Sequence, residues 1–285
     1  MKPYASVVYL TKNGGDLFRK SLETVCKQSV KFNYEIVAVD SGSTDGTLEL
    51  LSDAPGVSVV TIPPERFNFG ATRDYGFSLA KGDIIVTLSQ DVVPADLNWL
   101  MHMVAPFADT YVAAVQGMDV TPVDQEVFYW YQNGLFYSTN DVRKWNKQHD
   151  GIGLSFTSCA IRRSVWCQYP IGRAEMNEDK VFQKHIAGKG FKFLYQPLAR
   201  TYHAHMYDCG SLAKRCKNEG MGWRYCGLEY TFWDMVADMF NFKRLASLIL
   251  GIATGKVSRL AEVLFPIIRP LYLYLGNHFS HTYAR

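Results

Sequence analysis

Short apolar runs alternate with stretches of helical periodicity along the first half of the chain. The runs are continuously apolar, which is typical of strands buried on both faces of a parallel sheet. Predicted strands cover residues 6–10, 35–39, 57–62, 83–88 and 111–116. Predicted helices cover residues 17–28, 44–51, 71–80 and 94–107. Thr44 and Pro94 are the expected first residues of two of these helices, because a hydroxyl side chain caps a helix and proline fits its first turn.

The hydrophobic pattern changes after the fifth predicted strand. Residues 117–150 are irregular and rich in aromatic side chains. Weaker strand-like runs and one short helix follow, at 155–161, 191–195 and 200–203 and at 178–187 respectively. The strand–helix alternation predicts a Rossmann-like, doubly wound and mainly parallel sheet in a domain of residues 1–208. Helical periodicity after about Asp208 predicts a C-terminal helical region over residues 209–285.

Composition places the chain among globular proteins. Its 285 residues are 48% apolar and 20% charged, which suffices for a sizeable core. The mild net charge of +3 does not indicate a nucleic-acid-binding protein. The six cysteines form no C-x-x-C pair, which favours a reducing, cytoplasmic location. No signal peptide is expected, and no apolar run approaches the roughly 20 residues that a membrane-spanning helix needs.

Two carboxylates follow predicted strands of the sheet. Asp40 comes directly after the second strand, and Asp91 closes the segment Ser89-Gln90-Asp91 after the fourth. Because ligands of doubly wound sheets bind beyond the carboxyl ends of the strands, both acids should face one crevice. An ordinary capped turn explains the Gly- and Ser-rich loop after Asp40, but it does not explain the carboxylate itself. Asp91 suits a hard cation such as Mg²⁺ or Mn²⁺, which also takes phosphate oxygens.

Further charged residues lie at predicted helix starts. Arg73 falls in a first turn, where a cation opposes the helix dipole, so it indicates a partner. That partner is a nucleotide phosphate or base, or else a nearby carboxylate such as Asp40 or Asp74. Glu178 and Asp179 open a short helix. Complementing the helix dipole explains this pair on its own, and the functional alternative is a general base that deprotonates an acceptor hydroxyl.

Taken together, these segments resemble the inverting family 2 glycosyltransferases, which have the GT-A fold. The resemblance extends from about Ala5 to about His205 and is closest to the bacterial rhamnosyltransferases. It rests on residues 40–47, 66–73, 89–91 with Pro94 and Trp99 after them, 178–179 and 202–205. The combination is more specific for the family than for rhamnose as the donor sugar.

The resemblance implies that five residues bind the donor. Thr11 and Lys12 match a first loop that contacts the base, and Asp40 matches an acid that hydrogen-bonds the base. Arg73 matches a basic residue near the base and phosphates, and Gln90 is grouped with these donor contacts. The usual Pro and Tyr of the first loop are Leu10 and Lys12 here, which weakens any statement about which base is bound.

The resemblance also implies the catalytic and metal-binding residues. Asp91 matches the last acid of the family's D-x-D motif and would ligate Mg²⁺ or Mn²⁺, while Ser89 stands where the first acid is expected. His203 falls where related enzymes place a histidine near the metal or diphosphate. Asp179 matches the catalytic base, with Glu178 beside it toward the acceptor. The implied reaction is a single in-line displacement that inverts the configuration at C1 of the sugar.

The resemblance implies a nucleoside diphosphate sugar as donor, with L-rhamnose from dTDP-rhamnose expected, and a lipid-linked or polysaccharide acceptor. A UDP-sugar donor and a catalytically inactive sugar-nucleotide-binding scaffold are the alternatives. The C-terminal region mixes apolar and basic residues at helical spacing, as an interfacial helix on anionic lipid does. A helix docked on the domain or in a homo-oligomer explains the same pattern. With a lipid-linked acceptor, we expect a peripheral protein at the cytoplasmic face of the cell membrane.

A zinc site is a further alternative near the end of the predicted domain. His203, His205, Cys209 and Cys216 occur within a short segment. Their spacing fits no standard zinc site, and a strand histidine with unrelated buried cysteines explains them better.

Overall fold

A computed structural model of the protein describes residues 2–122 and 125–283. The chain forms two compact units. The first unit contains Met1–Val120, Leu154–Ala174 and Glu178–His203, and the second contains Thr121–Gly153, Glu175–Asn177 and Ala204–Arg285. The aromatic stretch after residue 120 therefore belongs with the C-terminal helices, although it lies far from them in sequence. The predicted boundary at residue 208 stays a prediction.

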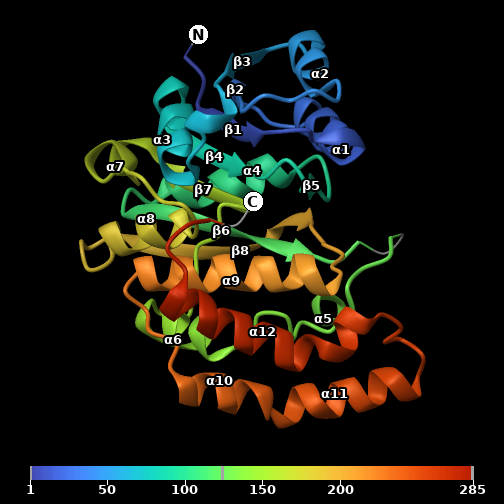
Figure 1. Cartoon of the computed structure of the whole chain (residues 1–285). Helices are drawn as coiled ribbons and strands as arrows, with labels where there is room; N and C mark the ends of the chain where they lie inside the picture. The colour runs from blue at the N-terminus through green and yellow to red at the C-terminus, as the bar shows by residue number, and fades with distance from the viewer. Residues whose placement is uncertain (1, 123–124, 284–285) are drawn as a thin grey trace. The chain divides into compact units, whose positions relative to one another are not determined.

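One mixed sheet forms the centre of the first unit (Figure 1). Its strands run in the order β3-β2-β1-β4-β7-β6-β8-β5. They are β1 (Ala5–Thr11), β2 (Tyr34–Asp40), β3 (Val57–Thr61), β4 (Ile84–Leu88), β5 (Val93–Pro94), β6 (Val112–Val120), β7 (Ser158–Arg162) and β8 (Lys192–Tyr202). The first four strands in this order are parallel, as the apolar runs predicted. β7 is antiparallel to both of its neighbours, and β5 is antiparallel to β8.

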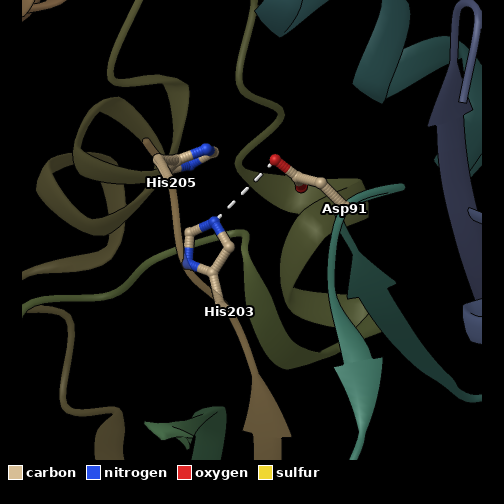
Figure 2. Close-up of side chains that lie close together, drawn as sticks. All are labelled: Asp91, His203 and His205. Atoms are coloured by element: carbon tan, nitrogen blue, oxygen red, sulfur yellow. Dashed lines mark ion pairs between the residues drawn. The ribbon is translucent and has the colours of Figure 1, made fainter. Parts of the chain in front are cut away.

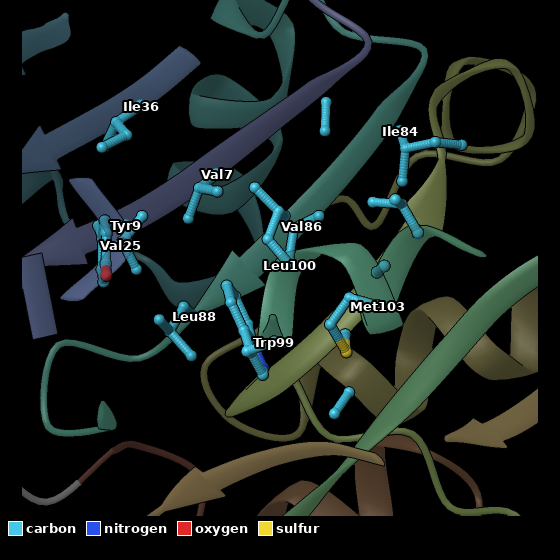
Figure 3. Close-up of a cluster of buried hydrophobic side chains, with 14 of the residues drawn as sticks. Val7, Tyr9, Val25, Ile36, Ile84, Val86, Leu88, Trp99, Leu100 and Met103 are labelled. Atoms are coloured by element: carbon cyan, nitrogen blue, oxygen red, sulfur yellow. The ribbon is translucent and has the colours of Figure 1, made fainter. Parts of the chain in front are cut away.

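Helices flank this sheet. They are α1 (Gly15–Cys26), α2 (Thr47–Asp53), α3 (Phe69–Leu79), α4 (Trp99–Val104), α7 (Arg163–Gln168) and α8 (Glu178–Ile186), with 3₁₀ turns at Pro64–Arg66 and Ala105–Ala108. The core includes side chains of β1, β4 and α4 (Figure 3). Trp99, Leu100 and Met103 of α4 are fully buried there against Val7 and Val86. Burial of each such side chain stabilises the fold by about 1.5–3 kcal/mol, so the strand ends that carry polar residues rest on a well-packed base.

Two predicted helix starts are wrong. Pro94 does not open a helix: it lies in β5, opposite Thr201 of β8, and the helix begins only at Trp99. Proline lacks a backbone N–H, which a short edge strand tolerates. Thr44 does not cap the next helix either, because α2 begins at Thr47 after Gly46, whose φ is +89°.

The second unit is helical. It contains α5 (Tyr129–Gln132), α6 (Asn140–Gln148), α9 (Cys209–Tyr225), α10 (Phe232–Met239), α11 (Phe242–Ala253) and α12 (Leu260–Phe279). α9 and α12 approach closely, since a Cβ added at Gly220 or Gly276 would overlap backbone of the facing helix. A buried ion pair between Arg269 and Glu219 also joins them, with 3.0 Å between Nη2 and Oε1. α10 and α11 follow one another along the side of α12 in Figure 1.

None of the helices in the described residues 2–122 and 125–283 combines the length and apolar character that crossing a bilayer requires.

Candidate active site

Asp40, at the end of β2, is the centre of a closed hydrogen-bonding loop. Its carboxylate is fully buried, and Oδ1 accepts from the backbone N–H groups of Gly42 at 2.9 Å and Ser43 at 2.8 Å. Oδ2 accepts from Thr11 Oγ1 at 2.8 Å and from Ser43 Oγ at 2.5 Å. Four donors satisfy the buried charge, as burial of a carboxylate requires. Asp40 therefore fixes the loop after β2 and bonds it to the carboxyl end of β1.

Gln90 joins the loop after β4 to the loop after β1. Its Oε1 accepts from Lys12 N at 2.8 Å, and its Nε2 donates to Lys12 O at 3.0 Å. The carbonyl oxygen and the NH2 group of the Gln90 side chain thus both bond to the backbone of Lys12. The Lys12 side chain is exposed. The predicted donor residues Thr11, Lys12, Asp40 and Gln90 consequently meet at one edge of the sheet, although they come from three different strands.

His203, just after β8, lies between two carboxylates, and Figure 2 shows one of them, that of Asp91. Its Nε2 is 3.8 Å from Asp91 Oδ2, and its Nδ1 is 3.7 Å from Asp119 Oδ2. Thr201 Oγ1 donates to the other oxygen of Asp119 at 2.9 Å, which orients that carboxylate. Burial alone would lower the pKa of His203, but Asp119 and Asp91 outweigh it and raise this pKa to about 10. Without a bound metal ion the two carboxylates favour the protonated imidazole, and coordination of a cation by this ring requires loss of that proton.

The same group of side chains has the composition of a divalent-cation site. A carboxylate oxygen of Asp91 and an imidazole nitrogen of His203 lie within 4.8 Å of one another, and Figure 2 shows these two side chains directed toward each other. Asp91 is 38% exposed, which leaves its carboxylate open to phosphate and water ligands as well. One carboxylate with imidazole suits Mn²⁺ better than Mg²⁺, which strongly prefers oxygen ligands. Cys209 and Cys216 do not belong to this group.

Asp179 occupies the first turn of α8. Its Oδ1 accepts from the N–H of Lys180 at 2.7 Å, and Oδ2 lies 3.4 Å from both Phe156 N and Lys180 Nζ. Lys180 Nζ also donates to the carbonyl of Leu154. The side chain of Asp179 is 16% exposed, so its carboxylate is partly accessible while its helix is bonded to the segment before β7.

Arg73 and Glu178 form an ion pair that sequence reasoning missed. Arg73 is 5% exposed, and its Nε and Nη2 donate to Glu178 Oε1 at 3.1 and 2.9 Å. Its Nη1 donates to Thr87 Oγ1 at 2.5 Å, and Phe156 packs 5.0 Å from its Cζ. The sequence analysis named Asp40 and Asp74 as the carboxylates that could pair with Arg73, and neither of them is its partner in this ion pair. The predicted contacts of Arg73 with the donor and of Glu178 with the acceptor stay predictions.

Asp119 is the main site residue that the sequence analysis did not single out. It lies near the end of β6, where the strand changes from buried to more exposed residues. Pairing of β6 with β8 places it opposite Thr201. An acid at a strand end was the only local signal, and the predicted fifth strand stopped at residue 116. The interaction spans more than 80 residues, so no local pattern reports it.

The sheet order, the carboxylate-bearing strand ends and the helical addition define the GT-A class of fold. Solved structures support this class. A mannosyltransferase from Pyrobaculum calidifontis, in complex with GDP-mannose and Mn²⁺, superposes with a TM-score of 0.63 at 16% identity, over 98% of this chain and 88% of that chain. Glucosyl-3-phosphoglycerate synthase from Mycobacterium tuberculosis, in complex with Mn²⁺, UDP-glucose and phosphoglyceric acid, gives 0.61 at 17% identity, over 80% of this chain and 81% of that chain.

Residues 6–168, more than half of the chain, match the model of glycosyl transferase family 2, and the chain belongs to this family. An O-antigen chain rhamnosyltransferase of Salmonella typhimurium is 28% identical over 71% of this chain and 67% of its own length. One of Salmonella anatum is 28% identical over 61% of this chain and 57% of its own length. An undecaprenyl-phosphate 4-deoxy-4-formamido-L-arabinose transferase of Aeromonas hydrophila is 37% identical over 46% of this chain and 38% of its own length. These relatives confirm the predicted resemblance.

Proposed function

We propose that this protein is an inverting, metal-dependent glycosyltransferase that moves a sugar from a nucleoside diphosphate to an acceptor hydroxyl. The observation that carries the proposal is the pair of Asp91 and His203, just after two strands of the sheet, in a chain of glycosyl transferase family 2. The pair has the ligand types of a Mn²⁺ or Mg²⁺ site, and Mn²⁺ accompanies sugar nucleotides in both solved relatives. A divalent cation held there supplies positive charge that stabilises a leaving diphosphate.

The residues of the chain divide the remaining work. Thr11, Lys12, Asp40 and Gln90 shape the loops at the carboxyl ends of β1, β2 and β4, where a nucleotide binds in doubly wound sheets. Asp179 accepts the proton of the acceptor hydroxyl as the oxygen of that hydroxyl forms its bond to C1. The bond between C1 and the diphosphate oxygen breaks on the opposite face, and its electron pair leaves with the nucleoside diphosphate. One displacement of this kind inverts C1.

We assign L-rhamnose from dTDP-rhamnose as the first donor to test. The two Salmonella relatives are rhamnosyltransferases by name, and their alignments extend farther along this chain than the other alignments described above. The acceptor class is a lipid-linked or polysaccharide glycan, as for chain-forming and undecaprenyl-phosphate enzymes. A UDP-sugar is the alternative donor, because a solved relative of the same fold binds UDP-glucose.

Thermal unfolding with a panel of nucleoside diphosphates and nucleotide sugars, with and without Mn²⁺ or Mg²⁺, tests the donor. A ligand that binds only the folded state raises the unfolding midpoint by mass action. A metal-dependent rise with dTDP or dTDP-rhamnose supports the rhamnosyl assignment, and a rise with UDP compounds alone replaces the sugar. No rise with any nucleotide contradicts the proposal and leaves an inactive scaffold.

Asp179→Asn tests the proposed base. The amide keeps the size of the side chain but cannot accept the proton, so we expect turnover to fall by about 10²–10⁴-fold. Binding of the nucleoside diphosphate should stay within about twofold of wild type, since Asp179 acts on the acceptor. A variant that keeps most of its turnover contradicts the assignment. Glu175→Gln, which removes a charge from a neighbouring position not assigned to the site, is the matched control.

We further propose that the protein works on the cytoplasmic face of the membrane through an apolar surface of α10 and α11. Trp233, Phe240, Phe242, Ile249 and Leu250 are between 63% and 82% exposed. Phe242 and Ile249 are seven residues apart and lie on one side of α11. Trp233 of α10 and Phe240, which directly follows α10, add further exposed aromatic side chains.

The charges around this surface favour anionic lipid. α11 contains no acid, and its Lys243 is exposed, whereas its Arg244 is buried and pairs with Asp238. The two acids of α10 are neutralised, because Asp234 pairs with Lys144 and Asp238 is buried and pairs with Arg143. Apolar and aromatic side chains flanked by uncompensated lysine suit the headgroup region of an anionic bilayer.

Flotation with vesicles of anionic phospholipid tests this surface. We expect the wild type to float with anionic vesicles and less with zwitterionic ones. Phe242→Glu with Leu250→Glu should stay in solution, while Leu198→Glu, a 57% exposed leucine of β8, should float like the wild type. Concentration-dependent dimerisation that these glutamates abolish, with no flotation of the wild type, would assign the surface to a second copy of the chain.

A further inference from the structure

The start of α3 is bonded to the segment that leads into α8. Asn68, Gly70, Arg73 and Asp74, here called the α3 cluster, lie within seven residues on and just before α3. Each of them contacts residues 171–174 or Glu178, about 100 positions later in the chain. All of these residues belong to the first unit. Residues 66–73 resemble a donor-binding segment in sequence. In the structure, Asn68 and Gly70 of this segment hydrogen-bond to the backbone of Ala174.

Two members of the cluster hold Ala174. Asn68 caps α3 by accepting from Ala71 N at 3.1 Å, and the same Oδ1 accepts from Ala174 N at 3.0 Å. Gly70 N donates to Ala174 O at 3.0 Å. The two segments approach so closely here that a Cβ on Gly70 would overlap the carbonyl of Gly172. Glycine is required at this position because the facing atom is backbone, which has no alternative rotamer.

Asp74 holds the beginning of the same segment. Its Oδ1 accepts from Trp166 Nε1 at 2.6 Å and from Ile171 N at 3.1 Å, and its Oδ2 accepts from Gly172 N at 2.7 Å. Three donors on one carboxylate, two of them backbone, fix the path of the chain after α7. Asp74 and Asn68 therefore hold the two ends of the segment 171–174.

Arg73 continues this attachment to α8 itself. Its guanidinium donates twice to Glu178, the first residue of α8, and once to Thr87 in the centre of the sheet. The side chains of Arg73 and Glu178 are only 6% and 11% exposed. At such burial an ion pair is held rigidly, and loss of one partner leaves an uncompensated charge. Asp179 is the next residue along the helix.

We propose that the α3 cluster, and Arg73 with Glu178 above all, positions Asp179 for the proposed proton transfer. Arg73 and Glu178 are positioning residues in this assignment, and they contact neither donor nor acceptor. The inference rests on the proposed role of Asp179 as the base. A base must lie within hydrogen-bonding reach of the acceptor proton, and a displacement of about 1 Å lowers turnover by about 10²-fold.

The test compares Arg73→Met, Glu178→Met and the double variant in the full chain. We expect each single variant to lower kcat by about 100-fold, while the Kd of the nucleoside diphosphate with Mn²⁺ stays within about twofold of wild type. The double variant should recover at least about tenfold in kcat, because it removes both buried charges together. Arg19→Met, the same change at an exposed position of α1, should behave as wild type.

Amide hydrogen exchange provides a readout that needs no catalysis. Arg73→Met should accelerate exchange in residues 171–174 and in α8, and leave β1, β2 and β4 unchanged. If Arg73→Met does not fold, Glu178→Gln takes its place, since its amide oxygen still accepts from Arg73. For this variant we expect a loss of about tenfold in kcat with unchanged nucleotide binding.

Two results would overturn the inference. Weakening of nucleotide binding by more than about tenfold in Arg73→Met, without recovery in the double variant, would make Arg73 a donor contact. Unchanged exchange in α8 together with unchanged kcat would remove the positioning role. If the wild type transfers no sugar from any donor, the proposed function fails, and the exchange measurement alone still decides whether the cluster holds α8 in place.

Discussion

Asp40 and Asp91 both follow strands of one sheet, yet their surroundings are opposite in kind. Asp40 is fully buried, and both of its oxygens accept two hydrogen bonds from the chain's own loops. Asp91 is 38% exposed and faces the imidazole of His203 across 3.8 Å, which is too long for a strong hydrogen bond. Asp40 is thus bonded within the chain, whereas Asp91 is partly accessible to solvent.

The difference separates a buried carboxylate that is bonded within the chain from a carboxylate that is partly exposed. A buried acid with four donors leaves no oxygen lone pair that is easily given to a ligand. A partly exposed acid beside an imidazole has the ligand types of a divalent-cation site. We therefore expect substitution of Asp91 to lower activity at nearly constant stability, and substitution of Asp40 to lower stability itself.

Asp91→Asn should give the larger effect on activity. Loss of the carboxylate removes a charged ligand of the proposed cation, so we expect turnover to fall by about 10²–10³-fold, a loss of the size seen for transition-state charge stabilisation. The rise in unfolding midpoint that Mn²⁺ adds to nucleotide binding should disappear as well. The midpoint without ligands should change by less than about 4 °C, because a partly exposed ion pair contributes about 0–1 kcal/mol.

Titration of Mn²⁺ against transfer, with unfolding followed in parallel, measures both quantities. Transfer at the wild-type rate without any metal would refute the role of Asp91, and so would a metal requirement that Asp91→Asn leaves unchanged. Asp83→Asn, an exposed acid at the opposite end of β4 that pairs with Lys2, controls for the loss of one negative charge.

Asp40→Ala should give the larger effect on stability. Two backbone N–H groups and two hydroxyls lose their acceptor, and we expect the free energy of unfolding to fall by about 3 kcal/mol. That corresponds to a midpoint lower by about 6–12 °C in a domain of this size. Asp40→Asn should lose only about 1 kcal/mol, because its amide oxygen still accepts from the backbone while Thr11 and Ser43 accept from its amide N–H groups.

Urea unfolding of the two variants beside wild type measures the contrast. Equal losses for alanine and asparagine would mean that charge, and not hydrogen-bond satisfaction, holds the loop. A fully stable Asp40→Ala that binds no nucleotide would return Asp40 to the donor-binding role that the resemblance implied.

The sequence predicted those parts of the site that local pattern determines. Asp40 and Asp91 were found because a continuous apolar run followed by an acid marks the end of a buried strand. Asp119 was missed, since its partners Thr201 and His203 come from a strand more than 80 residues later. The ion pair of Arg73 with Glu178 spans 105 residues and was missed for the same reason.

Strand direction was also outside the reach of local pattern. β7 was found as an apolar run, but the same run is compatible with either orientation, and only pairing with β4 and β6 shows that it is antiparallel. Pro94 misled for a related reason. Proline opens helices and ends edge strands equally well, and its pairing with β8 decides between them.

Gly42→Ala should give the smallest effect, and it separates the shape of the Asp40 loop from its charge. Gly42 has φ of +91°, and a Cβ there would lie 2.7 Å from Pro64 Cγ, in a rigid ring. We expect a loss of about 1–2 kcal/mol with all four bonds to Asp40 nominally retained. Gly46→Ala is the matched control, because φ there is +89° but nothing lies within 4 Å of the added Cβ. If both variants lose the same stability, backbone strain accounts for the whole effect; a larger loss at Gly42 measures how firmly the turn after Pro63 is packed against the loop that Asp40 builds.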